Sequence, residues 1–160
     1  MLKDLHVHAT VAASDLDRAR RFYEEKLGLT PAREEPGGLI YEQKDSWFLL
    51  YPSRGAGTAQ HTVMGFTTDD IEREVADLKA RGEVFEEYDF PGLKTENSIA
   101  RTGSVCSAWF KDTEGNILGL VQFSIMALVA GSGRGGGGQV HASPPVAETR
   151  SEPPPHDIAG

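Results

Sequence analysis

Two histidines, His8 and His61, are the residues whose type and position most suggest chemistry. Imidazole is a common ligand of zinc and nickel, whereas magnesium and manganese also need carboxylate oxygens. His8 lies in residues 5–13 and His61 begins residues 61–67, two segments with the composition of strands. We therefore treat both as weak metal candidates and as candidates for contact with an organic ligand. The alternative is a half-buried histidine satisfied by backbone or water at His8, and a solvated side chain at His61.

Aromatic side chains form a second group of candidates. Trp47, Tyr51 and Trp109 stand in short segments typical of strands, in which successive side chains point to opposite faces. One member of each pair, Trp47-Phe48 and Trp109-Phe110, is therefore expected to face a cleft. An apolar, aromatic surface suits planar or amphiphilic small molecules, and the alternative for each aromatic is a place in the core. The predicted ligand-binding residues are His8, Trp47, Tyr51, His61 and Trp109.

Other catalytic patterns do not occur in the sequence. It contains no Ser-His-Asp set, no phosphate-binding loop and no Rossmann glycine pattern. Cys106, the single cysteine, lacks the signature of a nucleophile, so we expect a small buried apolar residue there. Residues 90–104 are long for a connection between strands and are expected to form a lid, in which Lys94 and Arg101 meet an anionic group or are simply solvated.

The elements that must position these residues occur twice. Ser14 with Asp17, and Asp69 with Glu72, resemble capping boxes, and each precedes an amphipathic helix. A glycine ends each helix, at positions 28 and 82. The pairs Asp15-Leu16 and Asp70-Ile71 are thus equivalent points of a weak repeat with a spacing of about fifty-five residues.

Short strands complete each repeat. Besides residues 5–13 and 61–67, they are expected at residues 31–35, 39–43, 47–51, 83–88, 105–111 and 116–123. Modules of about residues 1–55 and 60–125 cannot each bury a helix stripe and a sheet face alone. The predicted fold is α+β, with paired βαβββ modules that form a curved eight-stranded sheet, helices outside and a concave cleft inside.

Composition sets the boundaries of the domain and the class of protein. Residues 1–125 form the expected domain, and residues 126–160, rich in glycine and proline, are expected to be a disordered tail. The net charge of −8 argues against a nucleic-acid surface. No segment has the pattern of a signal peptide or a membrane span, so we expect a cytoplasmic protein without a membrane partner.

Two motifs resemble the vicinal-oxygen-chelate (VOC) superfamily of glyoxalases, bleomycin-resistance proteins and dioxygenases. The first, which resembles its opening, is Ser14-Asp15-Leu16, Arg20-Arg21-Phe22-Tyr23 and Leu27-Gly28. The second, which resembles its closing hairpin, is Ala108-Trp109-Phe110-Lys111-Asp112 with Glu114-Gly115-Asn116-Ile117-Leu118. The resemblance covers about residues 5–123 and implies the fold. It leaves function open, because the superfamily includes isomerases, dioxygenases, epimerases, thiol transferases and drug-binding proteins.

The resemblance also implies where a metal would be held, by two histidines or glutamines and two glutamates. His8 matches the first position, but Leu49 or Leu50 stands at the second and Gly119 at the last, where glutamates are expected. The third position is Val63, and a β-bulge would be needed to bring His61 into line with it. We therefore predict no metal and no other cofactor.

The sequence thus favours a binding protein. We expect a glyoxalase/bleomycin-resistance-like protein that sequesters or senses an apolar or aromatic small molecule, and that forms the homodimer common in this superfamily. The first alternative is an enzyme, a divergent metal-dependent glyoxalase-type lyase or dioxygenase. The second is a subunit that acts through its tail.

Overall fold

Two helices form where an aspartate precedes an apolar stripe. The computed structural model describes residues 2–124, so the predicted tail at 126–160 lies outside the described residues. Helix α1 (Leu16–Glu25) is capped by Asp15, and helix α2 (Ile71–Ala80) by Asp70; each carboxylate accepts a hydrogen bond from the backbone N–H three residues later, at 2.9 and 3.1 Å. The equivalence of the two aspartates is confirmed. The predicted caps at Ser14 and Asp69 were wrong by one residue.

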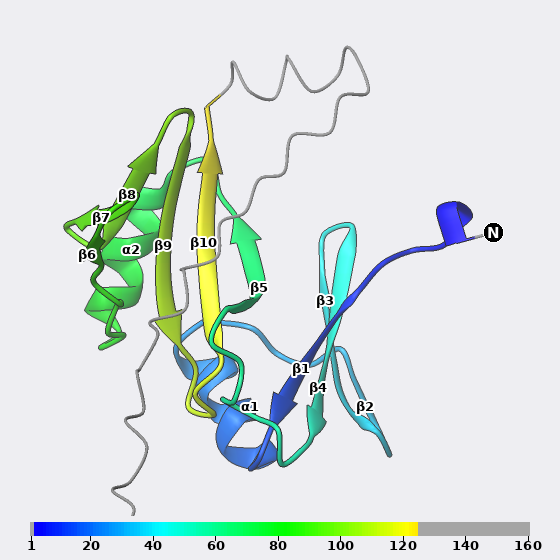
Figure 1. Ribbon diagram of the computed structural model, residues 1–160. Helices are drawn as coiled ribbons and strands as arrows, with labels where there is room; N and C mark the ends of the chain where they lie inside the picture. The colour runs from blue at the N-terminus through cyan, green and yellow to red at the C-terminus, as the bar shows by residue number, and fades with distance from the viewer. Residues whose placement is uncertain (1, 125–160) are drawn as a thin grey trace, which may run out of the picture.

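The first module forms a four-stranded sheet. Its strands lie in the order β1-β4-β3-β2, with β1 parallel to β4 and the other pairs antiparallel. Their bounds are β1 (Ala9–Ala13), β2 (Arg33–Glu35), β3 (Gly38–Gln43) and β4 (Ser46–Pro52). The first strand is shorter than predicted: residues 2–8 project from the body and include one 3-10 turn, Leu2–Asp4 (Figure 1).

The second module forms a six-stranded sheet on the same plan. The order is β5-β10-β9-β8-β7-β6, and the parallel pair is now β5 with β10. The bounds are β5 (Thr62–Thr67), β6 (Asp89–Phe90), β7 (Leu93–Glu96), β8 (Ile99–Thr102), β9 (Val105–Lys111) and β10 (Ile117–Phe123). Strands β1 and β5 contact each other. No hydrogen-bonded ladder joins them within residues 2–124, so two sheets replace the predicted eight-stranded one.

The predicted lid is a hairpin instead. Residues 90–104 contain β7 and β8, joined by Asn97 and Ser98 with φ of 54° and 71°. Positive φ at both central residues is the conformation of a tight two-residue hairpin turn, in which asparagine is common but serine stands where glycine is usual. Residues 83–88 form no strand, and Phe85 makes only an isolated bridge to Phe110.

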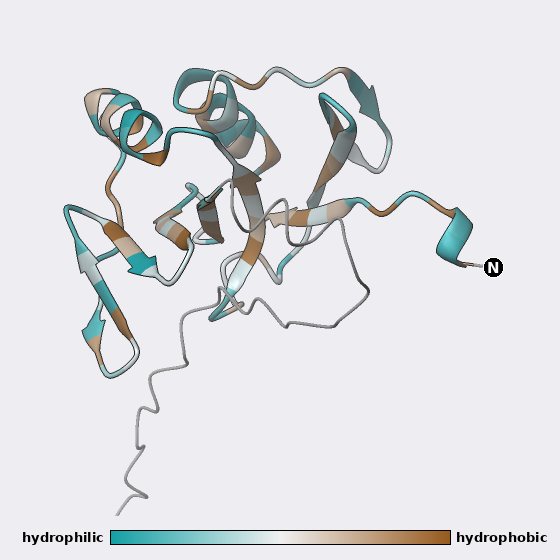
Figure 2. Cartoon of the chain, turned by 90° about the horizontal axis from the view of Figure 1, so that it is seen from above, coloured by the Kyte–Doolittle hydropathy of each residue, from teal (hydrophilic) through white to brown (hydrophobic). Residues whose placement is uncertain are grey.

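Both helices pack against one side of the sheets, as Figure 2 shows from above. The core lies on this side and joins both modules, because buried side chains of both helices and both sheets form one cluster. Members from the first module include Val11, Tyr23 and Phe48; members from the second include Val75 and Phe110. The opposite surface of the sheets, which carries no helix, is called the helix-free face below.

Candidate functional site

The helix-free face of the first sheet carries three of the predicted ligand-binding residues, His8, Trp47 and Tyr51. Phe48 and Leu50 of β4 are buried in the core, so by alternation Trp47, Leu49 and Tyr51 face the other way, and all three are half-buried. The parallel register places Thr10 of β1 beside Leu49. These side chains therefore form one apolar row along the middle of the sheet.

His8 and Trp47 form a stacked pair at the beginning of this row. Their ring centroids are 3.7 Å apart and their planes differ by 14°. The pairing follows from the register, since Ala9 lies opposite Phe48 and the preceding residues are the next neighbours. The imidazole remains exposed and Trp47 half-buried. The stack is a flat aromatic surface that a planar molecule could extend or enter.

Trp109 faces the same way on the second sheet, but it is covered. Phe110 lies in the main core, whereas Trp109 belongs to a second cluster with Ala100 and Ile117 and is 3% exposed. Tyr88 packs edge-on against its ring, with centroids 5.4 Å apart. The predicted opposite orientation of each aromatic pair is therefore what the structure shows, while Trp109 lies beneath the surface.

A β-bulge occurs at the start of β5. Ile117 lies opposite Thr62 and Leu118 opposite Met64, which leaves Val63 as the extra residue. The bulge brings Thr62, and not His61, towards Gly119, the last implied metal position. A Cβ at Gly119 would lie 3.3 Å from Thr62 Cγ2. His61 stands outside the strand and is exposed.

The residues at the implied metal positions do not fit a divalent ion. Leu49, Val63 and Gly119 offer no side-chain donor atom, which leaves His8 as the single donor among the implied positions. Among residues 2–124, no group of three or more His, Cys, Asp or Glu side chains is placed to hold a metal. We therefore derive no chemistry through a metal.

A buried carboxylate joins the two modules at the N-terminus of α1. Glu114, in the turn between β9 and β10, accepts hydrogen bonds from the backbone N–H of Ser14 and Asp15 at 2.7 and 3.0 Å. Arg18 donates to it from Nε and Nη2 at 2.8 and 3.0 Å. Burial by itself raises the pKa of Glu114, but the hydrogen bonds from Arg18, Asp15 and Ser14 lower it to about 2.

Other residues of this turn complete the junction. The Tyr23 hydroxyl donates to Asp112 at 3.3 Å, and the Asn116 side chain donates to the Ala12 carbonyl at 2.7 Å. Burial raises the pKa of Asp112, against hydrogen bonds from Asn116 and others. We call this junction, residues 112–116 with Ser14, Arg18 and Tyr23, the closed end. Its polar groups are engaged with one another, which makes it a structural element.

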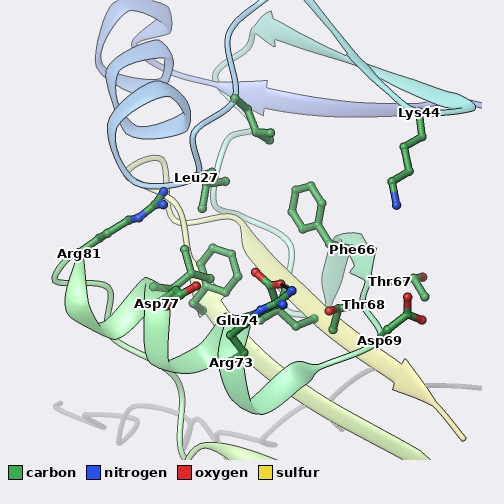
Figure 3. Close-up of a pocket in the computed structure, with 14 residues that line it drawn as sticks. Leu27, Lys44, Phe66, Thr67, Thr68, Asp69, Arg73, Glu74, Asp77 and Arg81 are labelled. Atoms are coloured by element: carbon green, nitrogen blue, oxygen red, sulfur yellow. Dashed lines mark hydrogen bonds and ion pairs between the residues drawn. The ribbon is translucent and has the colours of Figure 1, made fainter.

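A cavity of about 380 Å³ lies between the modules on the helix side (Figure 3). Its floor consists of Leu27, Leu29, Phe66, Leu78, Phe110 and Leu120, and its charged rim of Lys44, Asp69, Arg73, Glu74, Asp77 and Arg81. None of the five predicted ligand-binding residues lines it. The sequence signal for it is indirect: a turn of only two residues, Lys44 and Asp45, joins β3 to β4.

Comparison with known proteins places this geometry in a family. A model of the Glyoxalase/Bleomycin resistance protein/Dioxygenase superfamily matches residues 6–120. The chain belongs to this superfamily. The two modules, each with a parallel outer strand pair, are therefore VOC modules, as their motifs predicted. No functionally curated protein shows significant sequence similarity.

Solved structures of similar fold cover most of the described chain. TnmS3, an antibiotic binding protein from Streptomyces sp. CB03234, is 26% identical over 75% of this chain and 97% of its own, with a TM-score of 0.53. A glyoxalase/bleomycin resistance protein/dioxygenase from Alicyclobacillus acidocaldarius is 21% identical (78% and 96% covered, TM-score 0.57). A lactoylglutathione lyase from Agrobacterium tumefaciens is 20% identical (74% and 93% covered, TM-score 0.54). The last two bear on the fold alone.

The helices and Cys106 bear on two further predictions. Within residues 2–124, neither helix has the length and apolar character that crossing a bilayer requires. Cys106 is half-buried and packs against the main core, so it is less enclosed than predicted.

Proposed function

We propose that this VOC protein binds a planar aromatic or apolar small molecule on the helix-free face of its first sheet, and sequesters or senses it without a metal or other cofactor. The observation that carries the proposal is the stack of exposed His8 on half-buried Trp47. Strand pairing with β1 and β3 fixes the backbone under Trp47, so a ligand meets a preformed aromatic surface.

The remainder of the row supplies the apolar contact. Leu49 and Tyr51 follow Trp47 on the same face, and Ile40 of β3 is paired with Leu49. An aromatic stack adds about 0.5–1.5 kcal/mol beyond the apolar area that it buries. Tyr51 also brings a hydroxyl, which can orient a ligand by a hydrogen bond.

The second module has a lesser part in this proposal. Trp109 is covered by Tyr88 and does not reach the surface, whereas His61 offers an exposed imidazole beside the bulge. We further propose that two copies pair as a homodimer, which would bring a second set of these residues near the ligand. The similarity to TnmS3, an antibiotic binding protein, supports ligand binding as the activity class.

Tryptophan fluorescence tests the proposal with two reporters. Planar aromatic compounds should quench wild-type emission, and Trp47→Leu should weaken binding by about tenfold, equivalent to about 1.4 kcal/mol. Trp109→Phe is the matched control and should keep both the quenching and the affinity. Unchanged affinity in Trp47→Leu, measured by calorimetry, would exclude this face as the site.

The enzyme alternative is tested in the same titrations. Dialysis against a chelator, followed by addition of zinc, nickel or manganese, should leave the affinity for the aromatic compound unchanged. Binding or turnover that appears only with one of these ions would overturn the metal-free proposal. Size-exclusion chromatography with light scattering tests the dimer.

A further inference from the structure

The last hairpin of each module has a turn of different length. In the second module, five residues separate β9 from β10 and reach the N-terminus of α1, where they form the closed end. In the first module only Lys44 and Asp45 separate β3 from β4. This short turn faces the N-terminal half of α2 across the cavity (Figure 3). We call the cavity and its charged rim the open end.

Equivalent residues of the two helices have different surroundings. Arg18 corresponds to Arg73, and Tyr23 to Leu78, each fifty-five positions later. Arg18 and Tyr23 bind Glu114 and Asp112 of the long turn. At the open end Arg73 instead pairs with its neighbour Glu74 at 2.9 Å, and Leu78 lines the cavity. Space that protein atoms fill at the closed end is therefore left open at the other.

The floor of the cavity selects an apolar body. Phe66 points into the cavity from β5 (Figure 3). Leu78, Phe110 and Leu120, all buried, also line it. The volume of about 380 Å³ lies within the range of small-molecule sites. Apolar walls of this kind gain free energy when an apolar group displaces water from them.

The charged side chains of the rim determine which polar group of a ligand the cavity would accept. Arg73 is paired with Glu74, and the Arg81 guanidinium donates to the Lys26 carbonyl at 3.0 Å. Asp69 and Asp77 on the α2 side have no ion-pair partner within the described chain, and neither have Lys44 and Arg81, so the rim as a whole is balanced in charge. Because Arg81 is held at the Lys26 carbonyl, the two carboxylates and Lys44 are the charged groups left to meet a ligand. The net charge of −8 attracts cations to the protein, and a cation can pair with either carboxylate.

We propose that the open end, where Asp69 and Asp77 stand above the floor of Phe66, Phe110 and Leu120, is a second ligand site for organic cations. The ligand class is an aromatic or branched apolar body with a protonated amine. The amine lies towards the α2 carboxylates and the body on the floor. This site lies on the helix side and is separate from the helix-free face of the proposed function.

Matched naphthalene derivatives test both parts of this proposal. 1-Naphthylmethylamine, 1-naphthylmethanol and 1-naphthoic acid are titrated into the full chain at neutral pH, with calorimetry and 15N NMR as readouts. The amine should bind tightest, with amide shifts concentrated at Phe66, Thr68 and Asp77. Shifts confined to Thr10, Trp47 and Leu49 would overturn the site. An acid that binds as tightly as the amine would overturn the head group.

Variants separate occupancy of the cavity from charge. Leu29→Trp fills the space and should weaken amine binding more than about tenfold, whereas Val84→Trp adds the same ring at a 78% exposed position and should have no effect. Asp77→Asn should weaken the amine roughly threefold, with Asp17→Asn as the matched control. Trp47→Leu should abolish any naphthalene contact at the helix-free face but leave the amide shifts at Phe66, Thr68 and Asp77 unchanged, which distinguishes the two sites. If Leu29→Trp does not fold, Leu27→Trp replaces it, and the wild-type shift map decides the site alone.

Discussion

The closed end and the open end are built on one plan and differ in what fills them. At the closed end a five-residue turn brings Glu114 to the backbone of Ser14 and Asp15, and polar groups occupy the interior. At the open end a two-residue turn leaves an apolar cavity under a charged rim. A difference of three residues in turn length thus decides whether an end of the molecule is a junction that stabilises the fold or a space that can hold a ligand.

Removal of the Glu114 carboxylate should have the largest effect on this comparison. Glu114→Ala leaves two backbone N–H groups and the Arg18 guanidinium without their acceptor, and should lower the free energy of unfolding by about 3–5 kcal/mol. Glu74→Ala, which removes the half-buried acid that pairs with Arg73 at the open end, should cost less than about 1 kcal/mol. Urea denaturation of both variants measures the contrast, and equal losses would show that the two ends do not differ in kind.

Acid should weaken the closed end specifically. The pKa of Glu114 is about 2 in the folded protein, below the ordinary value of 4.5, so its contribution is present above the unfolded pKa and is lost as the pH falls through the folded pKa. Wild type should therefore lose roughly 3 kcal/mol relative to Glu114→Gln between about pH 5 and pH 2. Asp112, whose pKa is raised, acts in the opposite direction but is present in both proteins. A constant difference across this range would contradict the assignment.

A longer turn should close the open end. Replacement of Lys44 and Asp45 by the five residues Asp-Thr-Glu-Gly-Asn copies the turn of the closed end, and should reduce 1-naphthylmethylamine affinity by at least about tenfold, or about 1.4 kcal/mol. Quenching of Trp47 by planar compounds should survive. The opposite pattern, with amine binding kept and Trp47 quenching lost, would show that the cavity is not the amine site.

Loss of Lys44 alone should have the smallest effect. Lys44→Ala removes an unpaired cation of the rim and should strengthen amine binding by about two- to threefold, because exposed like-charge contacts are worth less than about 1 kcal/mol. Calorimetry with 1-naphthylmethanol as the uncharged control isolates the electrostatic part. A weaker affinity for the amine in Lys44→Ala would reverse the assigned sign of the rim.

Local signals carried most of what the sequence predicted about the fold. The helices, their glycine stops and the repeat of Asp15 and Asp70 depend on neighbouring residues. The first cap was misplaced by one because the Ser14 hydroxyl and N–H are engaged by Glu114, one hundred residues away. The hairpin at Asn97 and Ser98 was missed because serine stands where such a turn usually has glycine.

Long-range contacts account for what the sequence did not reveal about the site. The stack of His8 on Trp47 depends on the parallel register of β1 and β4, and the bulge at Val63 on the pairing of β5 with β10. The cavity depends on the distance between one module's turn and the other module's helix. The unequal turns are visible in the sequence, but their effect exists only once the modules are packed together.

The contact between Glu114 and the N-terminus of α1 also bears on how the protein folds. The carboxylate that completes the N-terminus of α1 comes from a residue 100 positions after Ser14, so α1 is synthesised long before its acceptor is available. We therefore expect the first module to reach its final stability only once the last hairpin has formed, and the two halves to unfold as one cooperative unit.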